Sequence, residues 1–315
     1  MDDIKIQNTH YLPEWLLWKF RQPVLYELDI LTGRTVVRKP KKAASAPNLW
    51  PPDVEDGFSI HDNQAARIYR NKLHGDRDIS LTGDERWDMG MWLAQFFVRS
   101  PGAMAHARNV IESDQRNPEV RRDIIDRKRD VILQKTRDAN PGLYDATVSK
   151  YGRELAEAAF LDGILMSDKW PSPESIHHAY MRQTGGEKFA KFLAGRQWVW
   201  IHSGAPLVIS DNPLCRWHVV RQRWDYGLDY DDVEITIPIN LDLCLRLQAR
   251  RGGDQDENVS CSVGRVRIYN CRQRLGAIKH VYGNSPVALD FIHQPIVGWA
   301  PLPHSSVATT PQVGV

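Results

Sequence analysis

Residues 198–214 read WVWIHSGAPLVISDNPL, and this stretch determines the class of fold that we expect. Two short runs of branched and aromatic residues, typical of β-strands, are joined by Ser-Gly-Ala-Pro, which is typical of a turn. The second run ends in a polar cluster that contains Asp211 and Asn212. Such a cluster at the end of a buried strand often belongs to a functional site, although Asp-Asn-Pro is equally good turn chemistry. The stretch therefore predicts two strands and leaves both interpretations of the cluster open.

Strand-like runs also occur closer to both ends of the chain. DVEITIPIN (232–240) and LCLRLQA (243–249) follow, and Pro238 is expected near a strand end or a sheet edge. Near the N-terminus, two runs within residues 23–40 flank Leu-Thr-Gly, which predicts a hairpin with Gly33 in its turn. We therefore expect an α+β fold: a mixed, mainly antiparallel sheet built from the N-terminal hairpin and the C-terminal strands, with a central helical insertion.

Helical spacing of apolar residues replaces the strand pattern over about residues 60–195, with Asp62 as a candidate N-cap. The clearest helix lies in TGDERWDMGMWLAQFFVRSP (82–101), where Thr82 or Asp84 can cap the start and Pro101 ends the pattern. Further helices are expected at about 102–138, 143–165, 173–194 and 262–283.

Composition is that of a water-soluble protein. The 315 residues are 42% hydrophobic and 25% charged, with a formal net charge of +2. No run approaches the roughly 20 apolar residues of a membrane-spanning helix, and the start lacks the pattern of a secretion signal, so we expect a cytosolic protein. The four cysteines form no C-x-x-C pair, which favours reduced thiols. We expect one domain over 1–290 and a loose tail over 291–315.

Three stretches are rich in arginine and lysine: RTVVRKPKK (34–42), RWHVVRQRW (216–224) and RVRIYNCRQR (265–274). In the second, Arg216, Arg221 and Arg223 are interleaved with aromatic rings, as on surfaces that bind single-stranded nucleic acid. The alternative is a solvated face whose long side chains cover apolar surface. The acidic residues of DYGLDYDDVE (225–234) follow at once and would neutralise much of the positive charge.

Five segments in a fixed order resemble a known family. They are THYLPEWLLWKF (9–20), FFVRSP (96–101), the stretch 198–214, VEITIPINLDLCLRL (233–247) and a late helix bearing Asn270. Together they resemble a bacterial family, domain of unknown function 4238, in which the usual forms are His-Tyr-Val-Pro, Arg-Thr-Pro and Thr-Ser-Asp-Asn-Pro. The resemblance covers roughly residues 8–285. It implies a fold and a set of positions, and no established reaction.

One departure from the family concerns acidic residues. The family often carries glutamates in the segment that here reads FSIHDNQAARIYRNKL (58–73), and this chain has none between Glu55 and Glu85. An acidic role in that segment is therefore in doubt.

Four candidate catalytic residues lie in the first and third of these segments. His10 can act as a general base or metal ligand, with Tyr11 as a hydrogen-bond donor. The alternative is that both rings are satisfied by backbone groups. Asp211 and Asn212 offer a carboxylate and an amide to a divalent metal ion or an attacking water, and the alternative is a turn.

Candidate substrate-binding residues lie on the 82–101 helix. Gln95 and Arg99 are one turn apart and can bind an anion together, although Arg99 can also cap free carbonyls. The arginines of 216–224 are the other candidates. The signatures of α/β-hydrolases, phosphate loops, Rossmann folds and zinc proteases do not occur in the sequence.

Two functional hypotheses follow. The first is a phosphodiester-hydrolysing, nuclease-like enzyme of a bacterial or mobile-element system, with His10 and Asp211 as base or metal ligands. The second is a non-catalytic regulatory module that binds nucleic acid or protein. Under the first hypothesis the Asp211 carboxylate faces the His10 ring and raises the pKa of the histidine.

Overall fold

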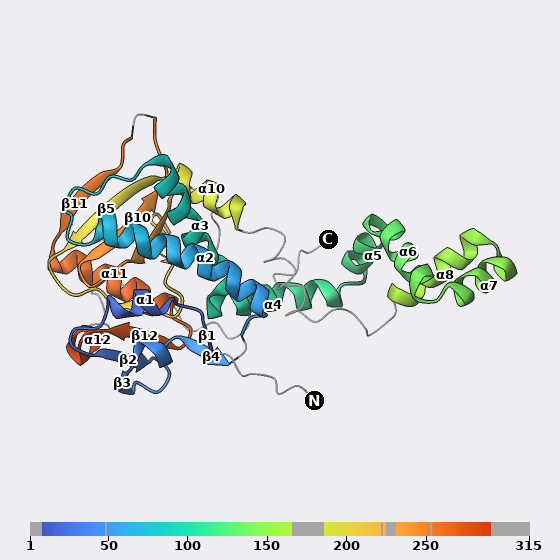
Figure 1. Cartoon of the computed structure of the whole chain (residues 1–315), viewed down its shortest axis with the longest axis horizontal. Helices are drawn as coiled ribbons and strands as arrows, with labels where there is room; N and C mark the ends of the chain where they lie inside the picture. Colours follow the sequence, from blue (N-terminus) through green and yellow to red (C-terminus); the bar gives the residue numbers. More distant parts are fainter. Residues whose placement is uncertain are drawn as a thin grey trace.

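The computed structural model describes residues 8–47, 49–165, 186–221, 223–224, 231–252 and 254–290. Strands and helices form a body from which a helical arm extends (Figure 1). The expected α+β class and mostly antiparallel pairing of strands from the two ends of the chain are confirmed, and the described strands form three sheets instead of the one expected. The predicted tail 291–315 and most of the predicted helix 173–194 lie outside the described residues.

The larger sheet has the strand order β11-β5-β10-β9-β7-β8. Its strands are β5 (Gln197–Ser203), β7 (Cys215–His218), β8 (Arg223–Trp224), β9 (Val233–Pro238), β10 (Leu243–Gln248) and β11 (Glu257–Cys261). All neighbours are antiparallel except β11 and β5. Pro238 ends β9, as expected for a residue that cannot donate to a central ladder. The Trp198 and Trp200 side chains are buried in the main core.

The second sheet joins the two ends of the chain. Its order is β3-β2-β12-β6, all antiparallel, with β2 (Leu25–Asp29), β3 (Thr35–Arg38), β6 (Ile209–Ser210) and β12 (His280–Gly283). The predicted hairpin is confirmed, and Gly33 has a φ of 70° in its turn. A separate two-stranded ladder pairs β1 (Asn8–His10) with β4 (Ser45–Pro47). The two strands of the stretch 198–214 therefore belong to different sheets.

Helices fill the space around and between the sheets. They are α1 (Glu14–Trp18), η1 (Pro40–Lys42), α2 (Pro52–Ile68), the π-helical turn η2 (Tyr69–Leu73), α3 (Gly83–Arg99), α10 (Glu187–Gly195), α11 (Val263–Gly276) and α12 (Pro286–Asp290). Apolar residues of α3 and α10 share one core with the larger sheet. α11 contacts β7 of one sheet and β6 of the other, and lies between them in Figure 1.

The start of α3 follows its sequence signal. Thr82 is the N-cap: its Oγ1 accepts from the Glu85 backbone N–H at 3.2 Å, and Glu85 Oε2 accepts from the Thr82 N–H at 2.9 Å. The helix ends at Arg99, and Pro101 begins the next helix. Asp62, the candidate N-cap of the preceding helix, lies instead inside α2, which begins ten residues earlier at Pro52.

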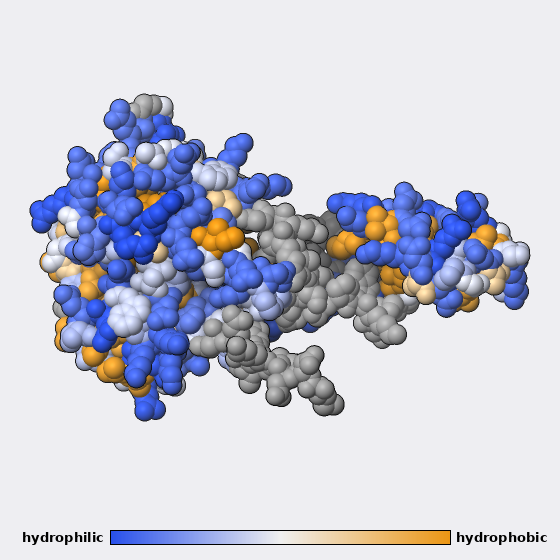
Figure 2. All heavy atoms as spheres, viewed as in Figure 1, coloured by the Kyte–Doolittle hydropathy of each residue, from blue (hydrophilic) through white to orange (hydrophobic). Residues whose placement is uncertain are grey.

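The arm consists of α4 (Pro101–Arg116), α5 (Pro118–Arg127), α6 (Arg129–Ala139), α7 (Pro141–Tyr151) and α8 (Arg153–Leu165). Ile125, Leu133 and Leu161 form a small core, and hydrophobic patches remain on its surface (Figure 2). The predicted helices 102–138 and 143–165 are each broken. Pro118 starts α5 after Asn117, the first predicted helix breaks again at Lys128, and Gly152 interrupts the second with a φ of 80°. No helix of the described part is long and apolar enough to cross a membrane.

Candidate functional site

Gln95 and Arg99, predicted to bind an anion, lie on the face of α3 that packs on α2. The Arg99 side chain is 1% exposed, and its Nη1 and Nη2 donate to Asp62 Oδ2 and Oδ1 at 2.9 and 2.8 Å. Trp92 Nε1 donates to the same carboxylate at 3.1 Å, and Gln95 Nε2 lies 3.5 Å from the Phe58 carbonyl oxygen. Because the guanidinium fork already matches a carboxylate, Asp62 is the anion that Arg99 binds.

His10 lies beside this ion pair. Its Nε2 is 3.2 Å from the Lys41 carbonyl oxygen, and its backbone N–H hydrogen-bonds to the Glu55 carboxylate. Burial lowers the pKa of His10 below 6.5 despite the Lys41 carbonyl and nearby carboxylates, and Arg99 lowers it further. Burial likewise raises the pKa of Glu55. The structure thus brings His10, Gln95 and Arg99 together with Glu55 and Asp62, acids that the sequence analysis did not propose.

The lowered pKa of His10 predicts a pH dependence of stability. As pH falls below 6.5, the unfolded chain takes up a proton that the folded chain binds less well, so the free energy of unfolding falls until the pH passes the folded pKa. Urea titrations between pH 7.5 and 5 will measure this loss. His10→Gln lacks the titrating ring and will lose less stability over the same range. Parallel curves for the two proteins would contradict the prediction.

Asp211 has a different set of partners. Its side chain is buried, and its oxygens accept backbone N–H groups of Ile278, Lys279 and His280 at 2.8, 2.8 and 3.0 Å. Burial raises the pKa of Asp211, and these three bonds oppose that effect. Since Asp211 N–H also donates to the His280 carbonyl oxygen, this residue fastens β6 to the segment that enters β12.

The structure describes both Asp211 and His10, and the two side chains form no hydrogen bond with each other. His10 lies against the Lys41 carbonyl oxygen, and Asp211 binds backbone N–H groups. The predicted rise in the pKa of His10 does not occur, because burial lowers it, and the carboxylates that oppose this effect are Glu14 and Asp62 instead of Asp211. The alternative of a local turn also differs from the structure, since the amides that Asp211 binds lie 67 to 69 residues further along the chain.

Tyr11 and Asn212 take part in two further buried connections. Tyr11 Oη lies 3.3 Å from Tyr282 Oη, which joins the start of the chain to β12. Ser100 Oγ donates to Asn212 Oδ1 at 2.9 Å, and Asn212 Nδ2 donates to the Gly276 carbonyl oxygen at 3.0 Å. Side chains near the ends of α3, β6 and α11 are therefore joined by hydrogen bonds that satisfy them internally.

The arginines of 216–224 lie on and after β7. The Arg216 guanidinium lies 5.4 Å from the centre of the Phe97 ring, and the Arg221 backbone N–H donates to His218 Nδ1 at 3.3 Å. Trp217 is 3% exposed and lies under the Arg272 guanidinium at 5.0 Å, so its ring offers no free stacking surface. Side chains of 223–230 lie outside the described residues.

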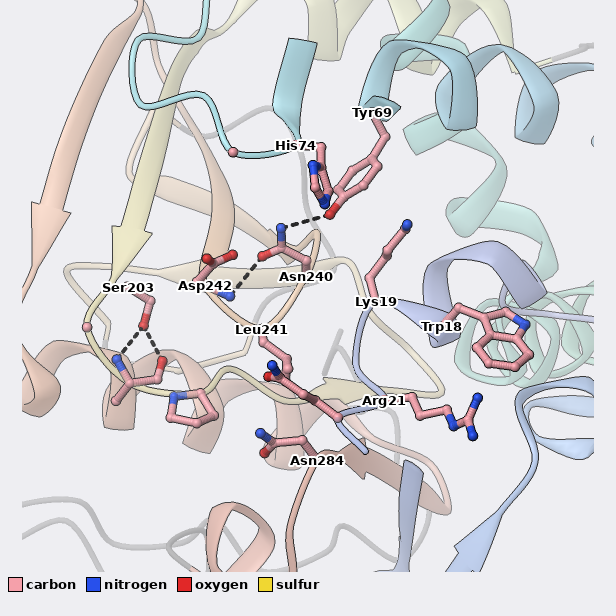
Figure 3. A pocket seen from close by; sticks show the side chains of 15 residues that line it. Trp18, Lys19, Arg21, Tyr69, His74, Ser203, Asn240, Leu241, Asp242 and Asn284 are labelled. Carbon is pink, nitrogen blue, oxygen red and sulfur yellow. Dashed lines mark hydrogen bonds between the residues drawn. The ribbon is translucent and has the colours of Figure 1, made fainter. Parts of the chain in front are cut away.

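A pocket of about 600 Å³ opens elsewhere on the body (Figure 3). Its walls come from the end of α1, the turn η2 and the residue after it, the loops at 203–206 and 240–242, and Asn284 after β12. None of the residues proposed from the sequence lines it. The π-helical turn places Tyr69 and His74 on this pocket, and such turns are frequent at functional sites.

Two cations line the pocket without an acidic partner among the described residues. Lys19 extends toward Tyr69 and Asn240 in Figure 3, and its Nζ lies 4.6 Å from the centre of the Tyr69 ring. The Arg21 guanidinium lies 4.6 Å from the ring of Trp18, which is 45% exposed. Cation–π contacts of this kind hold both charges in place without neutralising them.

Other polar groups complete the pocket. Tyr69 Oη accepts from Asn240 Nδ2 at 3.1 Å, and the His74 ring stands edge-on to the Tyr69 ring at 5.8 Å. Within the described residues, Asp242 is the acidic one among the lining side chains, and Asn284 Oδ1 has no hydrogen-bond partner. The pocket therefore combines cations, aromatic rings and a polar atom without a hydrogen-bond partner in the described chain. Small-molecule sites likewise combine aromatic side chains with a few polar groups.

The sequence left the cofactor unknown, with a divalent metal ion as one option. In the described ranges, no group of three or more His, Cys, Asp or Glu side chains is arranged to hold a metal ion. Both oxygens of Asp211, one of the proposed ligands, accept backbone N–H groups instead.

Comparison with known proteins agrees with the order of the five segments. Residues 8–286 match the family described as "Protein of unknown function (DUF4238)". No curated protein and no solved structure gave a significant match. Because the match covers nearly the whole chain, the protein belongs to the DUF4238 family.

Proposed function

We propose that this protein binds a phosphate ester of a nucleotide or nucleic acid in the pocket of Figure 3 and hydrolyses a phosphodiester there. The observation that carries the proposal is the pair of cations, Lys19 and Arg21, which line an open pocket beside Trp18 and Tyr69 without a carboxylate partner in the described chain. Phosphate groups prefer such donors, and nucleotide bases stack on aromatic rings and guanidinium planes.

The lining residues supply the roles that phosphodiester hydrolysis requires. Lys19 offsets negative charge on the phosphoryl oxygens, most strongly as that charge grows in the transition state, and Arg21 adds a second positive charge to the pocket beside Trp18. His74 is exposed on the pocket and serves as the general acid or base. Asp242, on the 240–242 loop, offers a carboxylate that can orient the imidazole or the attacking water.

In this proposal the reacting groups line the pocket, and His10 and Asp211 are not among them. Asp211 is 1% exposed and its oxygens are occupied by three backbone N–H groups, which favours a role in holding the fold. A lowered pKa keeps His10 neutral at pH 7, so it remains chemically suited to act as a base. Its neighbours Glu55, Asp62 and Arg99 form a network outside the pocket, however.

A non-catalytic binding module is the second candidate. It is favoured by the presence of only one carboxylate, Asp242, among the residues that line the pocket, because many metal-dependent nucleases position their ions with several acids. The two candidates share the ligand and differ in turnover, so one set of variants separates them.

We predict that Lys19→Gln and Arg21→Gln each weaken binding of a 5′-phosphorylated RNA decamer about tenfold, since a hydrogen bond to a charged group contributes about 1.5–3 kcal/mol. Fluorescence anisotropy will measure the dissociation constants. Lys150→Gln is the matched control, because Lys150 also lies over a tyrosine ring, at 4.8 Å from Tyr151, but on the arm. Equal affinities for all four proteins would remove the basis of the proposal.

Cleavage of the same decamer tests the enzymatic candidate. For a hydrolase, His74→Asn will cleave saturating RNA at least about a hundredfold more slowly than wild type, since general acid–base catalysis contributes about 10²–10⁴-fold. If wild type binds the decamer and leaves it intact, with magnesium, manganese or chelator present, the binding module is correct and the hydrolase is not.

A further inference from the structure

The dimensions of the pocket restrict what it can hold. At about 600 Å³ it lies within the range of about 300–1,000 Å³ that is usual for one small ligand. A duplex presents its bases stacked and paired, so only the edge of a groove or a phosphate could approach such a cavity. A free nucleotide or the last nucleotide of a single strand can enter it whole.

The chemistry of the pocket differs along its length. The Lys19 ammonium lies beside Tyr69 and His74, where a phosphate finds donors. Toward Trp18, Figure 3 shows the Arg21 side chain lying beside the indole ring, and together they form a flat cationic and aromatic surface. Bases stack on both kinds of plane, so this end suits a ring and the other end suits its phosphate.

Asn284 adds a polar group that the protein does not use itself. Its Oδ1 is buried and has no hydrogen-bond partner in the described chain, so turning this atom toward the pocket breaks no hydrogen bond that it makes. A half-turn of the amide exchanges oxygen and nitrogen, so the side chain can offer an acceptor or two donors to a base edge. Nothing of this kind is needed for a bare phosphate.

We propose that the ligand of this pocket is a single nucleotide, either free or at the 3′ end of a single strand, with its 5′-phosphate at Lys19, its base on the Trp18–Arg21 surface and its base edge at Asn284. This inference rests on the proposed function, because it names the ligand class of the same pocket. It adds that strand interiors and closed duplexes are excluded.

Calorimetric titration of the full chain tests the ligand class. The probes are adenosine and cytidine 5′-monophosphate, ribose 5-phosphate, inorganic phosphate, a 5′-phosphorylated DNA decamer and a dumbbell duplex without free ends. We expect either nucleotide or the decamer to bind at least tenfold more tightly than ribose 5-phosphate, and the dumbbell to bind at least a hundredfold more weakly than the decamer.

Variants then test which residues bind the base of the ligand and which bind its phosphate. Trp18→Leu and Asn284→Leu will reduce the preference for nucleotide over ribose 5-phosphate at least fivefold and leave the affinity for ribose 5-phosphate within twofold. Lys19→Gln will weaken both ligands equally. Circular dichroism confirms that each variant is folded, and Leu31→Ala, at an exposed residue of the hairpin turn, is the control for a surface change.

The outcomes separate the two proposals. If no phosphorylated probe binds, both the proposed function and this inference fail. If the dumbbell binds as tightly as the decamer, or ribose 5-phosphate as tightly as the nucleotides, the inference is wrong and the proposed function stands.

Discussion

Arg99→Met is expected to lower the free energy of unfolding by about 3–5 kcal/mol, because removing one partner of a buried ion pair leaves the other charge uncompensated. Arg99 is 1% exposed, both of its Nη atoms bond to Asp62, and its guanidinium packs on Phe58 and Phe96 at 5.3 and 4.7 Å. The substitution keeps most of the aliphatic stem and removes the charge. Urea unfolding followed by tryptophan fluorescence will measure the loss.

A surface pair provides the control for this experiment. Arg116 and Glu112 form an i,i+4 pair on α4 with side chains 80% and 39% exposed, so Arg116→Met should cost less than about 0.5 kcal/mol. The double variant Arg99→Met with Asp62→Leu should recover part of the loss, because it leaves no unpaired charge. A loss below about 1 kcal/mol for Arg99→Met would show that the pair does not hold α2 on α3.

Asp211→Ala is expected to cost about 3–5 kcal/mol, since it leaves three backbone N–H groups without their acceptor and each buried unsatisfied donor costs about 1–3 kcal/mol. Ile278, Lys279 and His280 carry these N–H groups, just before and at the start of β12. Asp211→Asn keeps one acceptor oxygen but turns an NH₂ group toward donors, so about half of that loss remains. The same unfolding measurement applies.

An exposed carboxylate with similar bonds is the control. Asp29 Oδ1 accepts the Leu31 and Thr32 backbone N–H groups in the hairpin turn, where water can replace it, so Asp29→Ala will lose much less stability. The variant Asp211→Asn also tests catalysis. If it stays as stable as wild type and yet loses all phosphodiester cleavage, Asp211 acts in the reaction and its structural assignment here is wrong.

Local signals accounted for much of the fold. The Thr82 capping box and the Gly33 turn involve neighbours in the sequence, and both form as predicted. The predicted helix over 262–283 failed after Gly276, because residues 280–283 pair with β2 and β6. That pairing, and the amide contacts with Asp211, depend on partners far away in the sequence, which a local pattern cannot include.

The candidate site was harder to predict, for a physical reason. Polar residues flanked by apolar sequence, such as Tyr11 and Asn212, proved to be buried and bonded to other parts of the protein. Lys19 lies in the apolar run WLLWKF and His74 in a polar loop, and only the fold brings their segments around one cavity. The Trp18-Lys19 pair followed by Arg21 was the available signal, since it joins an aromatic ring to two cations.

The sheet that joins β2 to β12 has a consequence during protein synthesis. Leu28 pairs with Val281, which the ribosome adds about 250 residues and, at about 5–20 residues per second, about 10–50 s later. Until then, the edge of β2 that later pairs with β12 is unpaired, and unpaired edges promote aggregation. Chains truncated before residue 280 therefore leave this edge unpaired, and the β2–β3 hairpin gains its final neighbour only after residue 283 has been synthesised.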